Sequence, residues 1–205
     1  AAGFGTRFLP ATKSVPKEML PVVDMPTIQY VVEECVESGI TDILMVIGKG
    51  KHALEEHFYS SRELEKRLED NEQFALLKKV RRISEMADIH FVWQKELNGL
   101  GDAVSHGRTF VGNDPFALLL GDTILRESDS SQSILQQMLE IHDAKNASVV
   151  ALEEVDRDRV SRYGIAGGTN ITDNLLALDQ IVEKPSAEEA PSNMAVAARY
   201  IFQPT

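Results

Sequence analysis

Short apolar runs alternate with helix-forming segments along this 205-residue chain, and this alternation restricts the fold more than any other feature. Residues 27–39 have the apolar spacing of a helix that ends at a glycine. Four runs have the length and apolar content of buried strands; they are residues 42–50, 89–94, 115–122 and 147–155. This order predicts an α/β fold with a Rossmann-like, mostly parallel (mixed) sheet that carries helices on both faces.

Residues 51–86 interrupt the alternation, because they are highly charged, form helices readily and contain no strand pattern. We expect a helical insertion at the rim of the sheet, with its charges in solvent. After residue 163, turn-rich short strands predict an antiparallel patch. No repeat and no Pro/Gly/Ser-rich linker divides the chain, so we expect one domain over residues 1–205.

The chain carries 32 acidic and 21 basic side chains, a formal net charge of −11 that repels nucleic acid and anionic membranes. No apolar run reaches the roughly 18 residues of a membrane-spanning helix, and no signal peptide is evident. The single cysteine, Cys35, excludes an internal disulfide and lies in a helical pattern typical of a packed core thiol. We therefore expect a cytoplasmic protein with neither nucleic-acid nor membrane partners.

The first 21 residues have the opposite charge balance. They hold Arg7, Lys13 and Lys17 against one acid, Glu18, beside two glycines. Glycines allow a backbone to approach a ligand closely and can direct successive N–H groups at an anion. Arg7 adds a planar fork that suits phosphate, and Lys17 adds a compact charge. We expect this loop to bind a small anion, and we assign Lys13 to the surface.

The glycine pattern does not define the ligand by itself. No Gly-Lys-Ser/Thr follows at the spacing of a P-loop, and Phe8 occupies the third glycine position of a dinucleotide fingerprint. A plain tight turn is equally consistent with two glycines at this spacing. The residues that follow the loop decide between these interpretations.

Residues 1–30 resemble the signature segment of the nucleotide-sugar pyrophosphorylases, G-x-G-T-R-x-x-P-x-T followed by P-K-x-x-x-P. Within that family they are most similar to the bacterial UTP–glucose-1-phosphate uridylyltransferases. Further segments share the resemblance; they are residues 53–69, 91–104, 118–125, 162–167, 181–186 and 191–202. The resemblance implies a nucleotidyltransferase (glycosyltransferase-A-like) fold.

The resemblance also implies a reaction in which UTP and glucose 1-phosphate form UDP-glucose and pyrophosphate. A sugar-phosphate oxygen would attack the α-phosphorus in line, with Mg²⁺ as the cofactor. Both substrates are anionic, so this chemistry needs neutralisation of charge and no acid–base pair. The resemblance further implies a homodimer or homotetramer.

The catalytic residues that the resemblance implies are Arg7, Lys17, Asp122 and Lys184. Arg7 and Lys17 would hold the triphosphate and its leaving group. Asp122 ends an apolar strand, where a carboxylate is costly unless it is hydrated, caps the turn or coordinates a cation. Its position alone leaves capping and metal binding open, and the resemblance assigns it to Mg²⁺.

Nucleotide binding is assigned mainly to backbone and amide groups. Gln94 offers a donor and an acceptor that match the O4 and N3–H edge of uracil, although a polar strand end would look the same. Gly99 would approach the base or the ribose. The nucleotide-binding set that the resemblance implies is Ala2, Gly3, Gly5, Thr6, Gln94 and Gly99.

The sugar phosphate is assigned to a second group of residues. Glu183 would accept hydrogen bonds from sugar hydroxyls, and Lys184 would hold the phosphate. Adjacent strand residues point to opposite faces, so both can meet one ligand only where the strand ends. An exposed Glu–Lys strand end remains the alternative. Gly164 would let backbone groups meet the sugar, and Asn193 would also line that pocket.

Two other functions remain open at this point. A related pyrophosphorylase could use dTTP or ATP and form dTDP- or ADP-glucose, because base selection depends on few groups; the helical segment favours uridylyl transfer. A non-catalytic regulatory subunit of this family would usually lack the loop arginine or the metal aspartate. Both Arg7 and Asp122 are present, which disfavours that function.

The family pattern extends beyond this sequence at both ends. It has a strand before the glycine loop and a further segment after residue 205, which in related enzymes includes a second acidic metal ligand. We therefore expect a catalytic domain without its first strand and its C-terminal part, and we expect residues 1–205 alone to turn over poorly.

Overall fold

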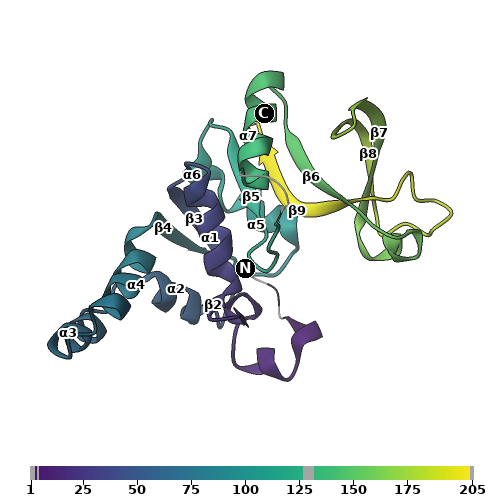
Figure 1. Ribbon diagram of the computed structural model, residues 1–205. Helices are drawn as coiled ribbons and strands as arrows, with labels where there is room; N and C mark the ends of the chain where they lie inside the picture. The colour runs from purple at the N-terminus through teal and green to yellow at the C-terminus, as the bar shows by residue number, and fades with distance from the viewer. Residues whose placement is uncertain (1–2, 4, 127–131, 204–205) are drawn as a thin grey trace. The chain divides into compact units, whose positions relative to one another are not determined.

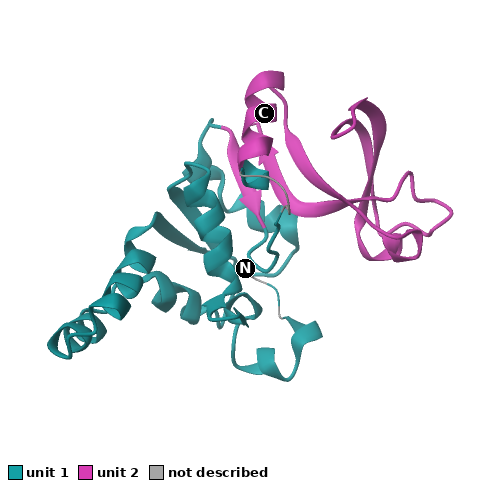
Figure 2. Cartoon of the chain, viewed as in Figure 1, with its two compact units in different colours: residues 1–114, 120–135, 204–205 teal, residues 115–119, 136–203 magenta. Residues whose placement is uncertain are grey.

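The computed structural model describes residues 3, 5–126 and 132–203 of the chain (Figure 1). The chain divides into two compact units, each with its own strands and buried core (Figure 2). Unit 1 comprises residues 1–114, 120–135 and 204–205, and unit 2 comprises residues 115–119 and 136–203. The single domain expected from the sequence stays a prediction.

Unit 1 begins with a loop that prolines interrupt. The loop contains three 3₁₀ turns: η1 Thr6–Phe8, η2 Ala11–Lys13 and η3 Lys17–Met19. Pro10 and Pro16 precede the second and third turns, where the fixed proline φ starts a turn but the missing N–H prevents a continuous helix. An antiparallel hairpin of β1 Pro21–Val22 and β2 Met25–Pro26 leads into α1 Thr27–Glu37.

α1 forms because its apolar residues recur at helical spacing and face the core. Ile28, Val32 and Cys35 are buried, which confirms the packed thiol expected at Cys35. Gly39 lies two residues after the end of the helix; it has φ 83° and donates its N–H to the carbonyl of Val36 over 3.0 Å. A glycine is favoured at this left-handed position after a helix.

β3 Asp42–Ile47 and β4 Asp88–Trp93 pair in parallel and in register over their whole length. Parallel pairing places both carboxyl ends at one edge, so the residues that follow the two strands start close together. The strands pack with α1 and the next helix of the chain. Their buried cluster is Ile28, Val32, Met45, Ile47, Leu54 and Phe58.

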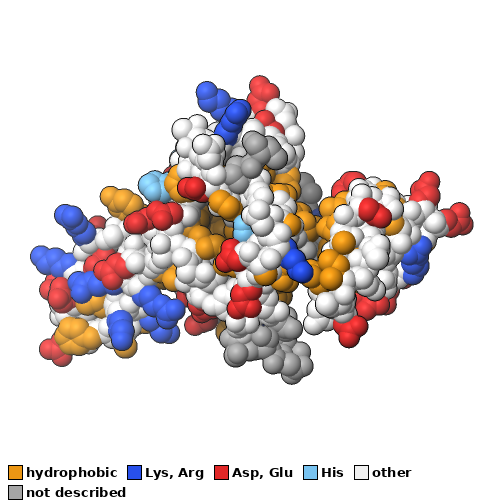
Figure 3. Space-filling view, turned by 90° about the horizontal axis from the view of Figure 1, so that it is seen from above, with side chains coloured by type: hydrophobic (Ala, Val, Ile, Leu, Met, Phe, Trp, Pro, Cys, Tyr) orange, Lys and Arg blue, Asp and Glu red, His pale blue; other side chains and the backbone are white. Residues whose placement is uncertain are grey.

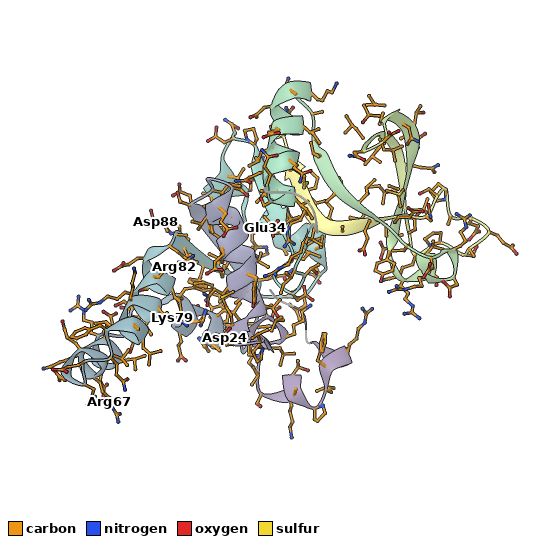
Figure 4. The ribbon with its side chains drawn as sticks, viewed as in Figure 1. Asp24, Glu34, Arg67, Lys79, Arg82 and Asp88 are labelled. Carbon is orange, nitrogen blue, oxygen red and sulfur yellow. The ribbon has the colours of Figure 1, made fainter. Side chains whose placement is uncertain are left out.

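Three helices connect β3 to β4: α2 His52–Phe58, α3 Arg62–Asp70 and α4 Phe74–Glu85. α2 buries two apolar side chains in the core, whereas α3 and α4 are mostly exposed. Figure 4 labels Arg67, Lys79 and Arg82 on these two helices, and all three are exposed. Figure 3 shows acidic and basic side chains intermingled over this part of unit 1. The charges of the segment lie largely in solvent, as expected, with Lys51 as a buried exception.

Three further helices follow β4: α5 Leu100–Ser105, α6 Arg108–Val111 and α7 Ile134–Lys145. α5 and α6 belong to unit 1, and α7 begins in unit 1 and continues in unit 2. Within the described ranges, no helix is both long enough and apolar enough to span a membrane.

Unit 2 is built on a five-stranded sheet in which β9 Met194–Phe202 pairs with three other strands. Its antiparallel partners are β5 Phe116–Leu119, β6 Val149–Glu154 and β7 Gly164–Thr172. β7 also pairs antiparallel with β8 Leu175–Glu183, and the 3₁₀ segment η4 Arg157–Arg162 precedes β7. The buried cluster of this unit is Val155, Val160, Ile165, Ala190 and Ala195.

The α/β class, the mixed pairing and the four strands predicted from apolar runs are confirmed. The antiparallel patch after residue 163 is also confirmed, and its strands β7 and β8 have nine residues each. Parallel pairing is rarer than expected. Among the described strands, only β3 and β4 pair in parallel. The expectation of a mostly parallel sheet is corrected in this respect: β9 returns antiparallel along β5 and β6, a long-range pairing that no local pattern reveals.

Candidate functional site

The glycine loop holds Lys17 against its own first residues. Gly5 has φ 65°, a left-handed conformation that favours glycine. A Cβ atom on Gly5 would lie 3.2 Å from Cβ of Lys17 and 3.2 Å from Cγ2 of Thr12. Thr12 also donates its hydroxyl hydrogen to the carbonyl of Gly5 over 2.8 Å. Gly5 therefore permits both the turn and the close approach of Lys17.

Lys17 forms an ion pair with Asp122, which follows β5 in the chain. Nζ of Lys17 and Oδ2 of Asp122 are 2.5 Å apart, and the two side chains are 22% and 30% exposed. A Cβ atom on Gly3 would lie 3.8 Å from the same Nζ. The structure thus brings Gly3, Lys17 and Asp122 together at a place that solvent can reach.

Arg7 and Thr6 lie in η1, and both are exposed. In the described part of the chain, Arg7 takes part in none of the ion pairs, so its guanidinium keeps its hydrogen-bond donors in solvent. The structure therefore does not join Arg7 to Asp122, and its role in phosphate binding stays a prediction. Ala2, the remaining loop residue predicted for the site, lies outside the described residues.

Glu18 and Lys51 form a second ion pair, which reasoning from the sequence missed. Nζ of Lys51 donates to Oε2 of Glu18 over 2.7 Å, and the side chains are only 7% and 1% exposed. Glu18 directly follows Lys17, and Lys51 comes from the chain after β3. The one available signal was an acid inside the proline-bounded, partly apolar stretch P-K-E-M-L-P.

Gln94 follows β4 and is buried. Its backbone N–H donates to the carbonyl of Ile47 over 2.9 Å, which continues the β3–β4 pairing. Its side-chain nitrogen donates to Oδ2 of Asp102 (2.6 Å) and to the carbonyl of Gly99 (3.2 Å). Both partners can only accept, so the amide nitrogen faces them and the amide oxygen points away. The structure brings the predicted Gln94 and Gly99 together, and it adds Asp102.

In unit 2, Glu183 ends β8 opposite Gly164 of β7. A Cβ atom on Gly164 would lie 3.2 Å from Oε2 of Glu183, so the carboxylate lies over the glycine. Lys184 has φ 48°, and its N–H donates to the carbonyl of Tyr163 over 2.9 Å. At this left-handed residue the extended strand ends, and side chains no longer alternate between the two faces of the sheet. Nζ of Lys184 therefore reaches Oε1 of Glu183 at 3.1 Å, and both side chains remain exposed.

Tyr200 of β9 contributes a hydroxyl to the same part of unit 2. Burial raises the pKa of this hydroxyl above the ordinary value of 10.0, and the negative charge of Glu183 raises it further. Tyr200 is therefore protonated at neutral pH and can donate a hydrogen bond. No sequence signal singled it out, because it is one aromatic residue within an apolar strand.

Asn193 has a different setting from Glu183 and Lys184. Its side-chain nitrogen donates to Oε1 of Glu154 over 2.9 Å. It lines a polar groove of about 430 Å³ formed by the end of β6 and the residues after it. Neither Glu183 nor Lys184 lines that groove. The described contacts join Asn193 to Glu154 and not to Glu183 or Lys184, and its role in the sugar pocket stays a prediction.

No three His, Cys, Asp or Glu side chains gather into a metal-binding group within residues 5–126 and 132–203. A single exposed carboxylate such as Asp122 still suits Mg²⁺, which proteins commonly bind through one or two carboxylates together with substrate phosphates and water. Asp122 thus fits a metal ion whose remaining ligands are phosphate oxygens and water.

Comparison with known proteins places this geometry in context. The nucleotidyl transferase family model matches residues 1–205. The UTP–glucose-1-phosphate uridylyltransferase of Bacillus subtilis (strain 168) is 47% identical over 204 residues, which cover 100% of this chain and 69% of that protein. The UTP-bound UGPase from Acinetobacter baumannii has a TM-score of 0.92 at 40% identity, covering 98% of this chain and 72% of that one. A UDP-glucose pyrophosphorylase complexed with UDP-glucose has a TM-score of 0.87 at 43% identity, covering 99% and 74%.

Proposed function

The chain belongs to the nucleotidyl transferase family, and we propose that it transfers the uridylyl group of UTP to glucose 1-phosphate, forming UDP-glucose and pyrophosphate. A relative that is 47% identical over 204 matched residues carries the name of this reaction, and similar structures are named as complexes with UTP and UDP-glucose. Within this chain, the ion pair of Lys17 and Asp122 beside the glycine loop supports the proposal most directly.

The reaction makes one bond to phosphorus and breaks another. An oxygen of the sugar phosphate bonds to the α-phosphorus, while the bond from that phosphorus to the leaving pyrophosphate breaks and pyrophosphate keeps the electron pair. The attacking oxygen is already ionised, so no side chain has to remove a proton. Negative charge grows on the leaving group, and the Lys17 ammonium is the loop cation held nearest to Asp122. Arg7 would add a second, more exposed cation from the same loop.

Asp122 would hold Mg²⁺ together with phosphate oxygens of the substrates, because its exposed carboxylate is a hard oxygen ligand. When bound, this ion would neutralise charge on phosphoryl oxygens. The Lys17 ammonium contacts one carboxylate oxygen of Asp122, so Lys17 and a bound metal ion would share this carboxylate. This arrangement keeps a positive group at Asp122 before substrate arrives.

Uracil recognition is proposed for the group around Gln94. The Gln94 nitrogen is committed to Asp102 and Gly99, so its oxygen is the atom that can accept a hydrogen bond from a base N–H. Asp102 does not have to touch the base in this arrangement; it determines which end of the amide faces the ligand. Gly3, Gly5 and Thr6 would supply backbone contacts to the nucleotide.

Glucose 1-phosphate is proposed to bind at Gly164, Glu183 and Lys184. The Glu183 carboxylate accepts hydrogen bonds only, which suits sugar hydroxyls, and the Lys184 ammonium suits the phosphate. Gly164 leaves the space that the Glu183 side chain occupies. Asn193, whose side-chain nitrogen donates to Glu154, stays a prediction for the same pocket.

The experiment that tests the function is a panel of UTP, dTTP, ATP and GTP against several sugar 1-phosphates, read as pyrophosphate release. We expect UTP with glucose 1-phosphate to exceed every other combination in kcat/KM by about 10-fold or more. Lys17→Ala is the control and should lower kcat by roughly 100-fold or more. Preference for another nucleotide, or no release from any pair, would contradict the proposal.

Two cellular properties belong to the same proposal. We expect the protein in the cytoplasm, and we expect it to act as a homodimer or homotetramer. Light scattering of the purified protein measures the second property directly, and a monomer at micromolar concentration would contradict it.

A further inference from the structure

The ion pair of Glu18 and Lys51 is the most buried charged contact described in unit 1. The residues are 0% and 6% exposed, and one hydrogen bond of 2.7 Å joins Nζ of Lys51 to Oε2 of Glu18. Oε1 of Glu18 is buried too and has no hydrogen-bond partner among the described residues. Removing two charges from water is costly, and one hydrogen bond compensates little of that cost. Stability is therefore a poor explanation for the pair.

Lys51 is a rigid anchor at one end of the pair. Its carbonyl accepts the N–H of Leu54 over 3.0 Å in the first turn of α2, and the Leu54 side chain is completely buried. Leu54 belongs to the core cluster that also contains Met45 and Ile47 of β3. The position of the Lys51 ammonium is thus set by the core of unit 1.

Glu18 is the middle residue of η3, directly after Lys17. A 3₁₀ turn has three residues per turn, so consecutive side chains project about 120° apart. If Glu18 points into the core, Lys17 has to point outward, which is where it meets Asp122. Met19, the next residue, packs against the core cluster. Glu18 and Met19 together therefore determine how η3 is rotated about its axis.

We infer that Glu18 and Lys51 are positioning residues: their buried ion pair fixes the rotation of η3 and thereby aims the Lys17 ammonium at Asp122 and the substrate phosphates. The inference rests on the proposed function for its effect on turnover. Its structural part, the dependence of η3 on Lys51, stands independently. Through Lys51, the helical segment of residues 51–86 would then influence the position of a catalytic lysine.

The decisive variant replaces both charges by apolar side chains of similar length, Glu18→Met with Lys51→Met. Removing one partner alone leaves an unpaired buried charge, and such a protein can fail to fold, whereas apolar replacement of a whole buried pair is commonly tolerated. We expect the double variant to fold but to lose about 10- to 100-fold in kcat, the range typical of a misplaced catalytic group, with little change in KM for glucose 1-phosphate. Wild-type kcat in a folded double variant would overturn the inference.

A comparison with Lys17→Ala distinguishes positioning from a general structural effect. If the pair acts through Lys17, the double methionine variant should lower kcat little further in a Lys17→Ala background, because contacting groups are not additive. An equal loss in both backgrounds would overturn the inference. The matched control is Glu65→Met with Arg81→Met, an ion pair of 2.9 Å between α3 and α4, which should leave kcat unchanged.

Hydrogen exchange gives a readout that does not depend on activity. The N–H groups of Met19 and Leu20 donate to the carbonyls of Pro16 and Lys17 within η3. We expect the double methionine variant to lose protection at these two amides while those of β3 and β4 keep theirs. Unchanged protection at Met19 and Leu20 would overturn the inference, whether or not the wild type is active with UTP. An inactive wild type would contradict the proposed function instead.

Discussion

The side-chain nitrogen of Gln94 donates to Oδ2 of Asp102 over 2.6 Å, and this contact orients the buried amide of Gln94. A carboxylate accepts hydrogen bonds only, so the orientation of the amide is determined and its oxygen is available to a ligand. Selectivity for a base would then depend on a residue that has no need to touch that base.

Asp102→Asn tests this dependence. An asparagine can meet either end of the Gln94 amide, so only the longer hydrogen bond to the Gly99 carbonyl, at 3.2 Å, would still favour the present orientation. We expect KM for UTP to rise by about 10-fold, corresponding to one hydrogen bond of roughly 1.4 kcal/mol, with a smaller change in kcat. Steady-state kinetics measures both. Glu96→Gln, an exposed change in the segment between β4 and α5, is the control, and an unchanged KM for UTP in Asp102→Asn would contradict the role.

Gly5→Ala and Gly39→Ala form a matched pair of substitutions. Both glycines are left-handed, with φ 65° and 83°, so each alanine should cost roughly 1–2 kcal/mol of stability. Only Gly5 lies against Lys17, whereas a Cβ on Gly39 meets nothing within 4 Å. We expect urea denaturation to show similar losses and kcat/KM to fall only in Gly5→Ala. Equal activity of the two variants would show that the loop tolerates displacement of Lys17.

Val23→Asn should stabilise the protein. Val23 has φ 63° in the turn between β1 and β2, a conformation that β-branched residues strongly disfavour, and it is 93% exposed. Asparagine tolerates this conformation, and no packing is lost. We expect a gain of about 1 kcal/mol in the free energy of unfolding, measured by urea denaturation. Val22→Asn, in the extended strand β1, should give no gain.

His57 should make the protein less stable as the pH falls. Burial lowers the pKa of His57 below its ordinary value of 6.5, so the folded state binds a proton less readily than the unfolded state. The stability contribution is therefore present above about pH 6.5 and is lost as the pH falls from there through the lower folded pKa. Thermal unfolding between pH 8 and 5 measures this slope.

The matching substitution is His57→Gln, which should flatten the pH dependence of the melting temperature. His52→Gln provides the control, because the His52 side chain is 68% exposed. If the two variants kept the same slope as the wild type, the pH dependence would come from other groups.

Local patterns predicted most of the secondary structure. The four apolar runs became strands and the segment from residue 51 became helices, because periodicity and length are properties of neighbouring residues. The direction of strand pairing was harder to predict. The partners of β9 come from distant parts of the chain, so no local pattern indicated that most strand pairs would be antiparallel.

For the candidate site as well, the sequence predicted which motifs contribute residues but missed contacts between distant residues. The sequence motifs assigned Lys17 and Asp122 to the phosphates and the metal ion, and Gln94 and Gly99 to the nucleotide; the structure adds that each pair is in contact. The burial of Glu18 was missed, because an acid next to a lysine looks solvent-exposed until its partner, 33 residues away, is known. Asn193 was assigned to the sugar site by motif alone, and its hydrogen bond to Glu154 had no signal in the sequence because the two residues are 39 positions apart.

The in-register pairing of β3 and β4 has a consequence for how this protein can be shortened or extended. A parallel connection needs a dozen or more residues, and the link between these strands is far longer than that minimum. Deletions or inserted tags in α3 and the turn before α4 should therefore leave the strand register intact. A deletion should begin only after α2, because Lys51 binds Glu18 of the glycine loop and Leu54 packs in the core of unit 1. A shortened variant would keep α2 and also α4, whose Ile83 packs against the core cluster, and would lose only α3.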